Sequence, residues 1–145
     1  MRCSVAGLST VAGTSLRAVA SVFSSSTKGF RLRECGVWNT TSTAVYVSLV
    51  RFTNATGVGA GLTEVQWDAE HDPVPLATGF AGHTADGAVG SPIRYAELGA
   101  VVGSGVIWTF GEEGFCINIG TANGVGVICP SGTGQILTYY FDWNE

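Results

Sequence analysis

The stretch that decides the fold lies near the end of the chain and reads Gln135-Ile136-Leu137-Thr138-Tyr139-Tyr140-Phe141-Asp142-Trp143. Large apolar side chains recur there at every second position, at Leu137, Tyr139, Phe141 and Trp143. Because successive side chains of a β-strand point to opposite faces of the sheet, this period of two predicts a strand with one wholly apolar face. Such a face must pack against a second layer of structure.

The same alternation predicts strands along most of the chain. Phe30, Leu32 and Trp38 alternate with polar residues, and Val45, Val47 and Leu49 share one face of the next stretch. The polar run of residues 39–42 between them predicts a hairpin turn. We expect further tight turns at residues 103–105 and 112–114, and shorter strands at residues 2–8, 15–23, 62–67, 93–102, 106–110, 115–119 and 124–129.

Composition agrees with an all-β fold. The 145 residues include 21 glycines, and Lys, Gln and Met, which favour helices, are scarce. Many short strands joined by glycine-rich turns predict an antiparallel β-sandwich of jelly-roll type, with about eight to ten strands. We expect one domain, in which residues 1–28 form an N-terminal arm or edge strands and residues 29–145 form the sandwich.

Charge and hydropathy narrow the classes of partner. The net charge of −4 argues against nucleic acid, because phosphate binding needs clustered Lys and Arg. No stretch approaches the ~20 apolar residues of a membrane span, and the N-terminal stretch is too polar for a secretory signal. Only 12% of the residues are charged and 46% are hydrophobic, so we expect apolar surface to be buried between subunits.

Few residues suggest catalysis or metal binding. Asp68, His71 and Asp72 lie in one polar segment that could hold a cation, although Pro73 after it is more typical of a plain turn. A Ser–His–Asp triad built on His71 or His83 has no nucleophile motif to support it. The adjacent Glu112 and Glu113 fit a polar hairpin tip better than a glycosidase pair. We therefore expect no enzyme, no metal and no cofactor.

The cysteines and tryptophans are the last residues in the sequence with a possible binding or cross-linking role. No two of the four cysteines have C-x-x-C spacing, so we interpret them as small buried apolar residues, with disulfides as the alternative. They are Cys3, Cys35, Cys116 and Cys129. The four tryptophans are expected to pack in the core or at an interface, and a sugar-binding face is the alternative. They are Trp38, Trp67, Trp108 and Trp143.

Several segments together resemble a known group of proteins. They are Asn39-Thr40-Thr41, Leu49-Val50-Arg51-Phe52-Thr53, Gly105-Val106-Ile107-Trp108-Thr109-Phe110, Gly120-Thr121-Ala122-Asn123-Gly124-Val125-Gly126-Val127 and Tyr140-Phe141-Asp142-Trp143-Asn144-Glu145. From about Arg31 onward the chain resembles small virion proteins of tailed bacteriophages, which have a jelly-roll, TNF-like sandwich. The resemblance implies a capsid decoration or minor head protein, often trimeric. It transfers no binding residue.

The resemblance leads to one functional hypothesis. We expect a decoration (cement) protein on the exterior of the virion capsid, assembled in the host cytoplasm, that binds the major capsid protein and forms a homotrimer. The expected shell contacts are an N-terminal arm of residues 1–16 and a loop of residues 69–92. The candidate residues are Met1, Arg2, Val5, Leu8, Leu16, His71, Pro73, Phe80 and His83, and the candidate subunit interface is Trp108, Tyr139, Phe141 and Trp143. A chain without residues 1–16 should then stay folded.

Two alternatives stay open. A carbohydrate- or receptor-binding jelly-roll module, such as a spike tip or a lectin, predicts an exposed aromatic platform. An enzyme on a cupin-like barrel needs clustered histidines, of which this chain has two in all.

Overall fold

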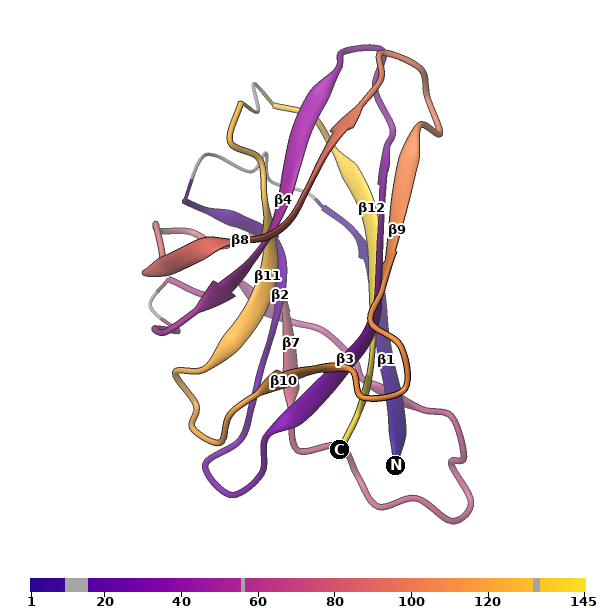
Figure 1. Cartoon of the computed structure of the whole chain (residues 1–145), viewed down its shortest axis with the longest axis vertical. Helices are drawn as coiled ribbons and strands as arrows, with labels where there is room; N and C mark the ends of the chain where they lie inside the picture. The colour runs from indigo at the N-terminus through magenta and orange to yellow at the C-terminus, as the bar shows by residue number, and fades with distance from the viewer. Residues whose placement is uncertain (10–15, 56, 132–133) are drawn as a thin grey trace.

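The computed structural model describes residues 1–9, 16–55, 57–131 and 134–145, and it is an antiparallel β-sandwich. Two sheets lie face to face in Figure 1, and no helix occurs in the described ranges. The prediction of an all-β sandwich is confirmed. The strands are β1 (Arg2–Leu8), β2 (Ala18–Phe23), β3 (Phe30–Asn39), β4 (Val45–Phe52), β5 (Ala60–Gly61), β6 (Val65–Gln66), β7 (Thr78–Ala81), β8 (Val89–Leu98), β9 (Gly105–Thr109), β10 (Phe115–Ile117), β11 (Gly124–Ile128) and β12 (Leu137–Asn144).

The chain passes repeatedly from one sheet to the other. Sheet A has the order β10-β3-β12-β1-β6, with β9 also paired to β3, and sheet B has the order β5-β7-β2-β11-β4-β8. Leaving out the short strands β5, β6 and β7, every connection crosses between the sheets except those from β4 to β8 and from β9 to β10. The strand count exceeds the expected eight to ten because the segment between β4 and β8 adds these three short strands.

The three predicted tight turns are not hairpins. Residues 39–44 connect β3 in sheet A to β4 in sheet B, and residues 99–104 connect β8 in sheet B to β9 in sheet A. The buried Asn39 shapes the first crossing, because its amide nitrogen donates to the carbonyls of Thr43 and Gly99. Residues 110–114 connect β9 to β10, and both of these strands pair with β3 on the side opposite β12. Alternation identified these strands but not their partners.

The N-terminal residues do not form a free arm. All seven residues of β1 pair with β12, and β6 covers β1 on its other side at Cys3 and Ser4. The strand predicted for residues 2–8 is confirmed as β1, and the alternative of a free arm is wrong for these residues, because Cys3 and Val5 belong to the core. Residues 10–15 of the expected arm lie outside the described residues. The strand predicted for residues 15–23 is β2, which lies between β7 and β11.

The core lies between the inner faces of the two sheets. Tyr139, Phe141 and Trp143 of β12 meet side chains such as Val47 and Leu49 of β4, and all of these are at most 2% exposed. Burial of such apolar surface is the main driving force for this arrangement. All four cysteines are free thiols, and only Cys116 is exposed, so the expectation of burial fails for that residue alone.

A second apolar cluster covers part of the outer face of sheet B. Phe23, Val50 and Phe52 alternate with core residues along β2 and β4, so they point away from the main core. The segment between β4 and β8 covers them with Val58 and Phe80 among others, and Val89 at the start of β8 packs there too. Residues 69–92 are therefore only partly a loop, since β7 and the start of β8 lie within them.

Candidate functional site

The four residues expected at a subunit interface belong to the chain's own core. Tyr139, Phe141 and Trp143 are at most 2% exposed and Trp108 is 7% exposed. Their alternation was interpreted correctly as an apolar face, but the face meets sheet B of the same chain. The interface assignment is corrected accordingly, because these side chains have no surface left for a partner.

The residues expected to contact a shell separate into three groups. Val5, Phe80 and His83 are buried or largely covered, so they cannot form a contact surface. Leu8 and Leu16 are exposed, at 54% and 40%, on separate strands or their flanks. Of the remaining four, Met1 and Arg2 lie at the end of the sandwich marked N in Figure 1, where Arg2 contacts Trp67. His71 and Pro73 lie on the segment between β6 and β7 that follows Trp67.

That end carries an exposed apolar segment, residues 65–76, which we call the apolar loop. Four large side chains on it face solvent: Val65 is 56% exposed, Trp67 59%, Val74 76% and Leu76 48%. In Figure 1 this segment, drawn in pink, extends beyond the sheets near both chain ends. The sequence predicted a contact loop in this region from its prolines and lack of periodicity.

Hydrogen bonds hold the apolar loop in place at both ends. The Glu145 carboxylate accepts from the backbone nitrogens of Leu76 and Ala77, at 2.8–3.1 Å. The Gln66 side chain donates to the Pro73 carbonyl at 3.1 Å. At the start of the loop, the Arg2 guanidinium lies 3.6 Å from the centre of the Trp67 ring and also pairs with Asp142. The loop therefore presents its apolar side chains in a preset arrangement.

The polar run within this loop organises a turn. Asp68 Oδ1 accepts from the backbone nitrogens of Glu70 and His71 and lies 3.2 Å from His71 Nδ1. In the described part of the chain, no group of three or more His, Cys, Asp or Glu side chains has the arrangement of a metal site. The segment matches the plain turn that Pro73 suggested.

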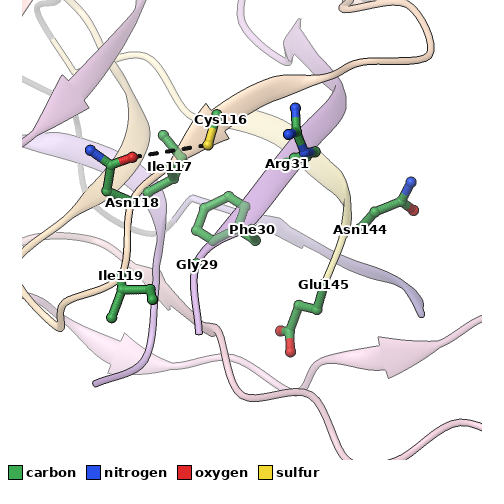
Figure 2. Close-up of a pocket in the computed structure, with 9 residues that line it drawn as sticks. All are labelled: Gly29, Phe30, Arg31, Cys116, Ile117, Asn118, Ile119, Asn144 and Glu145. Carbon is green, nitrogen blue, oxygen red and sulfur yellow. Dashed lines mark hydrogen bonds between the residues drawn. The ribbon is translucent and has the colours of Figure 1, made fainter. Parts of the chain in front are cut away.

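An open cleft of about 650 Å³ lies beside the base of the apolar loop (Figure 2). Its floor includes the buried Phe30 and Ile117, and Ile119 forms an exposed apolar wall. Glu145, which anchors the loop, also lines the cleft. The exposed Cys116 thiol contacts Asn118 Oδ1 at 4.0 Å. An apolar floor with a polar rim is suited to receiving an apolar group from a partner.

The two histidines are in opposite environments. His71 lies exposed on the apolar loop, whereas His83 is fully buried beside the second apolar cluster, where its ring contacts the rings of Phe23 and Phe52. His83 Nε2 lies 2.6 Å from Ser21 Oγ. This Ser–His pair has the composition of a catalytic dyad, but both side chains are 0% exposed, so no substrate reaches them.

Two aromatic rings lie on the outer face of sheet A. The rings of Trp38 and Tyr140 stack with centroids 5.6 Å apart, and both are partly exposed. They occupy space that glycines leave open: a Cβ on Gly105 would lie 2.0 Å from Trp38 Cδ1, and a Cβ on Gly36 would lie 2.3 Å from Tyr140 Cε1. The indole therefore extends over the backbone of two neighbouring strands. We call Trp38 and Tyr140 the aromatic platform.

A polar pocket of about 290 Å³ adjoins the platform. It is lined by Arg2, Arg33, Glu34, Thr109, Gly111 and Glu112. The Tyr140 hydroxyl donates to Glu34 Oε1, so one residue of the platform is bonded to one residue of the pocket. Burial and this hydrogen bond raise the pKa of the Tyr140 phenol, which keeps its proton. The sequence offered Trp38 among four candidate sugar-binding tryptophans but could not assemble the site, because its residues come from four separate strands and their connections.

Comparisons with protein-family models, with curated proteins and with solved structures each found no match for this chain. None of the described residues forms a helix of the length and hydrophobicity needed to cross a membrane.

Proposed function

We propose that this chain is a structural virion protein, a decoration protein that binds the outside of a tailed-phage head shell through the apolar loop and the adjacent cleft. The observation that carries the proposal is the preset exposure of Val65, Trp67, Val74 and Leu76 on one hydrogen-bonded segment. An apolar surface that is already ordered loses little conformational entropy when it docks.

The strand order supports the jelly-roll assignment on which the phage resemblance rests. The longer strands of sheet A follow the order β1-β12-β3-β9, and those of sheet B follow β2-β11-β4-β8. Among these eight longer strands, each one and the next along the chain lie in opposite sheets, except β4 and β8. Eight long strands in two such sheets are typical of jelly rolls.

The mechanism would be linkage between binding and shell stability. A protein that binds the assembled shell and not its separated subunits stabilises the assembled state by mass action. The major capsid protein is the expected partner, and Trp67 and Val74 are the expected anchors. A homotrimer stays a prediction that native mass spectrometry of the purified chain tests.

The first experiment measures the copy number of this chain per major capsid protein in purified particles from its source, by quantitative mass spectrometry. The proposal expects a ratio of roughly one third to one, as stoichiometric coverage by a symmetric oligomer requires. A few copies per particle would assign the chain to a tail or spike, and its absence from particles would contradict a virion role.

The second experiment places the contact. Val74→Asp should weaken binding to stripped shells by about tenfold or more, because docking would bury an unpaired charge. Val102→Asp is the matched control, since Val102 is 67% exposed on the β8–β9 connection at the other end of the sandwich (Figure 1). Equal effects of the two substitutions would overturn the assignment of the contact to the apolar loop.

A further inference from the structure

We infer that the aromatic platform and its polar pocket form a binding site for a neutral sugar. The inference does not depend on the proposed shell binding, because the rings of the platform lie on the outer face of sheet A, apart from the four exposed apolar side chains of the apolar loop. The two sites meet only at Arg2, which lines the polar pocket and packs on Trp67. The carbohydrate-binding alternative predicted an exposed aromatic surface, and the inference places that surface at Trp38 and Tyr140.

The surroundings of the platform show that it is an ordered surface. Directly paired residues of adjacent antiparallel strands share a face. Two cross-strand rows on the outer face are therefore Leu8-Thr138-Trp38-Gly105 and Ala6-Tyr140-Gly36-Ile107. The glycines let the two rings lie close to the backbone, and Ile107, 53% exposed, extends the apolar area beside them.

The next row supplies hydrogen-bonding groups. It reads Ser4-Asp142-Glu34-Thr109, so the apolar area ends at a line of hydroxyl and carboxylate groups. Glu34 and Thr109 line the pocket together with Arg2 and Arg33. A pyranose ring has apolar C–H faces and a hydroxyl rim, so one face would stack on the rings while its rim bonds to these groups.

The charges of the pocket favour a neutral ligand. Arg2 and Arg33 contribute two positive charges, and Glu34 and Glu112 contribute two negative charges. Arg2 is already paired with Asp142, and Arg33 donates to the Glu112 carbonyl. With Asp142 counted, the site has three carboxylates and two guanidiniums, so it offers donors and acceptors but no spare positive charge. This suits hydroxyl groups better than a carboxylate, a phosphate or a sulfate.

The test uses the full chain and a panel of methyl glycosides of glucose, galactose, mannose and N-acetylglucosamine with their short oligomers. Binding is measured by calorimetry and by ligand-observed NMR, with and without EDTA. We expect binding to at least one member that is insensitive to EDTA, because the described residues of the site contain no metal ligand cluster. No binding to any member at about 10 mM, ten times the ~1 mM dissociation constant of a weak site, would overturn the inference.

Three variants locate the site. Trp38→Ala should lower affinity at least tenfold by removing the platform, and Glu34→Gln should lower it severalfold while leaving both rings in place. Tyr95→Ala is the matched control, because Tyr95 is 54% exposed and pairs with Tyr46 at 5.7 Å on sheet B. If Trp38→Ala does not fold, the sugar affinity of Glu34→Gln tests the location of the site instead. Unchanged affinity in the variants, or a change in native mass on Trp38→Ala without sugar binding, would show that the face has a different role.

Discussion

His83 Nε2 and Ser21 Oγ lie 2.6 Å apart, and neither side chain reaches solvent. The pair joins the segment between β4 and β8 to β2, beneath the covering residues of the second apolar cluster. His83 Nδ1 is buried without a hydrogen-bond partner, so protonation of the ring would place a charge in an apolar site.

Stability should therefore fall with acid because of His83. Burial lowers the pKa of His83 to about 4, whereas an unfolded chain binds that proton near pH 6.5. Between these values the unfolded state binds more protons, so the stabilisation is complete above pH 6.5 and is lost as the pH falls toward 4, by about 3 kcal/mol.

Urea unfolding at pH 7 and pH 4 checks this with two variants. His83→Gln keeps a neutral hydrogen-bonding group and should remove the part of the pH dependence that comes from this ring. His71→Gln, at the exposed histidine, should leave the dependence as it is in the parent chain. Equal pH dependence in His83→Gln and the parent would exclude His83 as the source.

Removing residues 1–16 should unfold the sandwich. All of β1 would be lost, and β12 would lose the partner that pairs with it from Thr138 to Asn144. The buried side chains of Cys3 and Val5 would leave the core. We expect the truncated chain to lack a cooperative thermal transition and near-ultraviolet circular dichroism. A truncated chain that still unfolds cooperatively would restore the arm that the sequence suggested.

Trp143→Ala should lower the free energy of unfolding by about 3–5 kcal/mol, because it leaves a cavity in the core. Trp143 is 0% exposed and packs against Phe30 with ring centroids 6.0 Å apart. Ile107→Ala, at an exposed site, should change the free energy of unfolding by about 0.5 kcal/mol or less. Urea denaturation measures both. A native mass that changes while stability does not would instead support a subunit interface at Trp143.

Gly105→Ala should displace the Trp38 indole and cost about 1–3 kcal/mol, since the added Cβ has no room. We expect tryptophan emission to shift to longer wavelength as the ring becomes more exposed. Gly61→Ala is the control, because a Cβ there has no neighbour within 4 Å. Equal losses of stability in the two variants would indicate a general cost of replacing glycine in a strand.

The sequence by itself determined the class of fold and much of the core. Alternation of apolar residues is a local property, so it identified β12 and its inward face of Leu137, Tyr139, Phe141 and Trp143 without knowledge of the rest. The same reasoning found β3 and β4, but it placed Trp38 on the face of Phe30 and Leu32. A register shift between β3 and β12 instead puts Trp38 on the outer face. Prolines and missing periodicity indicated a loop at residues 69–92, which overlaps the apolar loop at residues 69–76, because prolines and irregular patterns disfavour regular strands.

Only the tertiary structure decided which strands pair, and therefore where each side chain faces. Residues 39–44 have the composition of a hairpin turn, yet they cross between sheets, because pairing depends on strands distant in sequence. Trp38 and Trp143 both follow an alternating pattern, but one lies on the outer face and the other in the core. Alternation assigns residues to two faces, and the packing of the whole chain determines which face is buried.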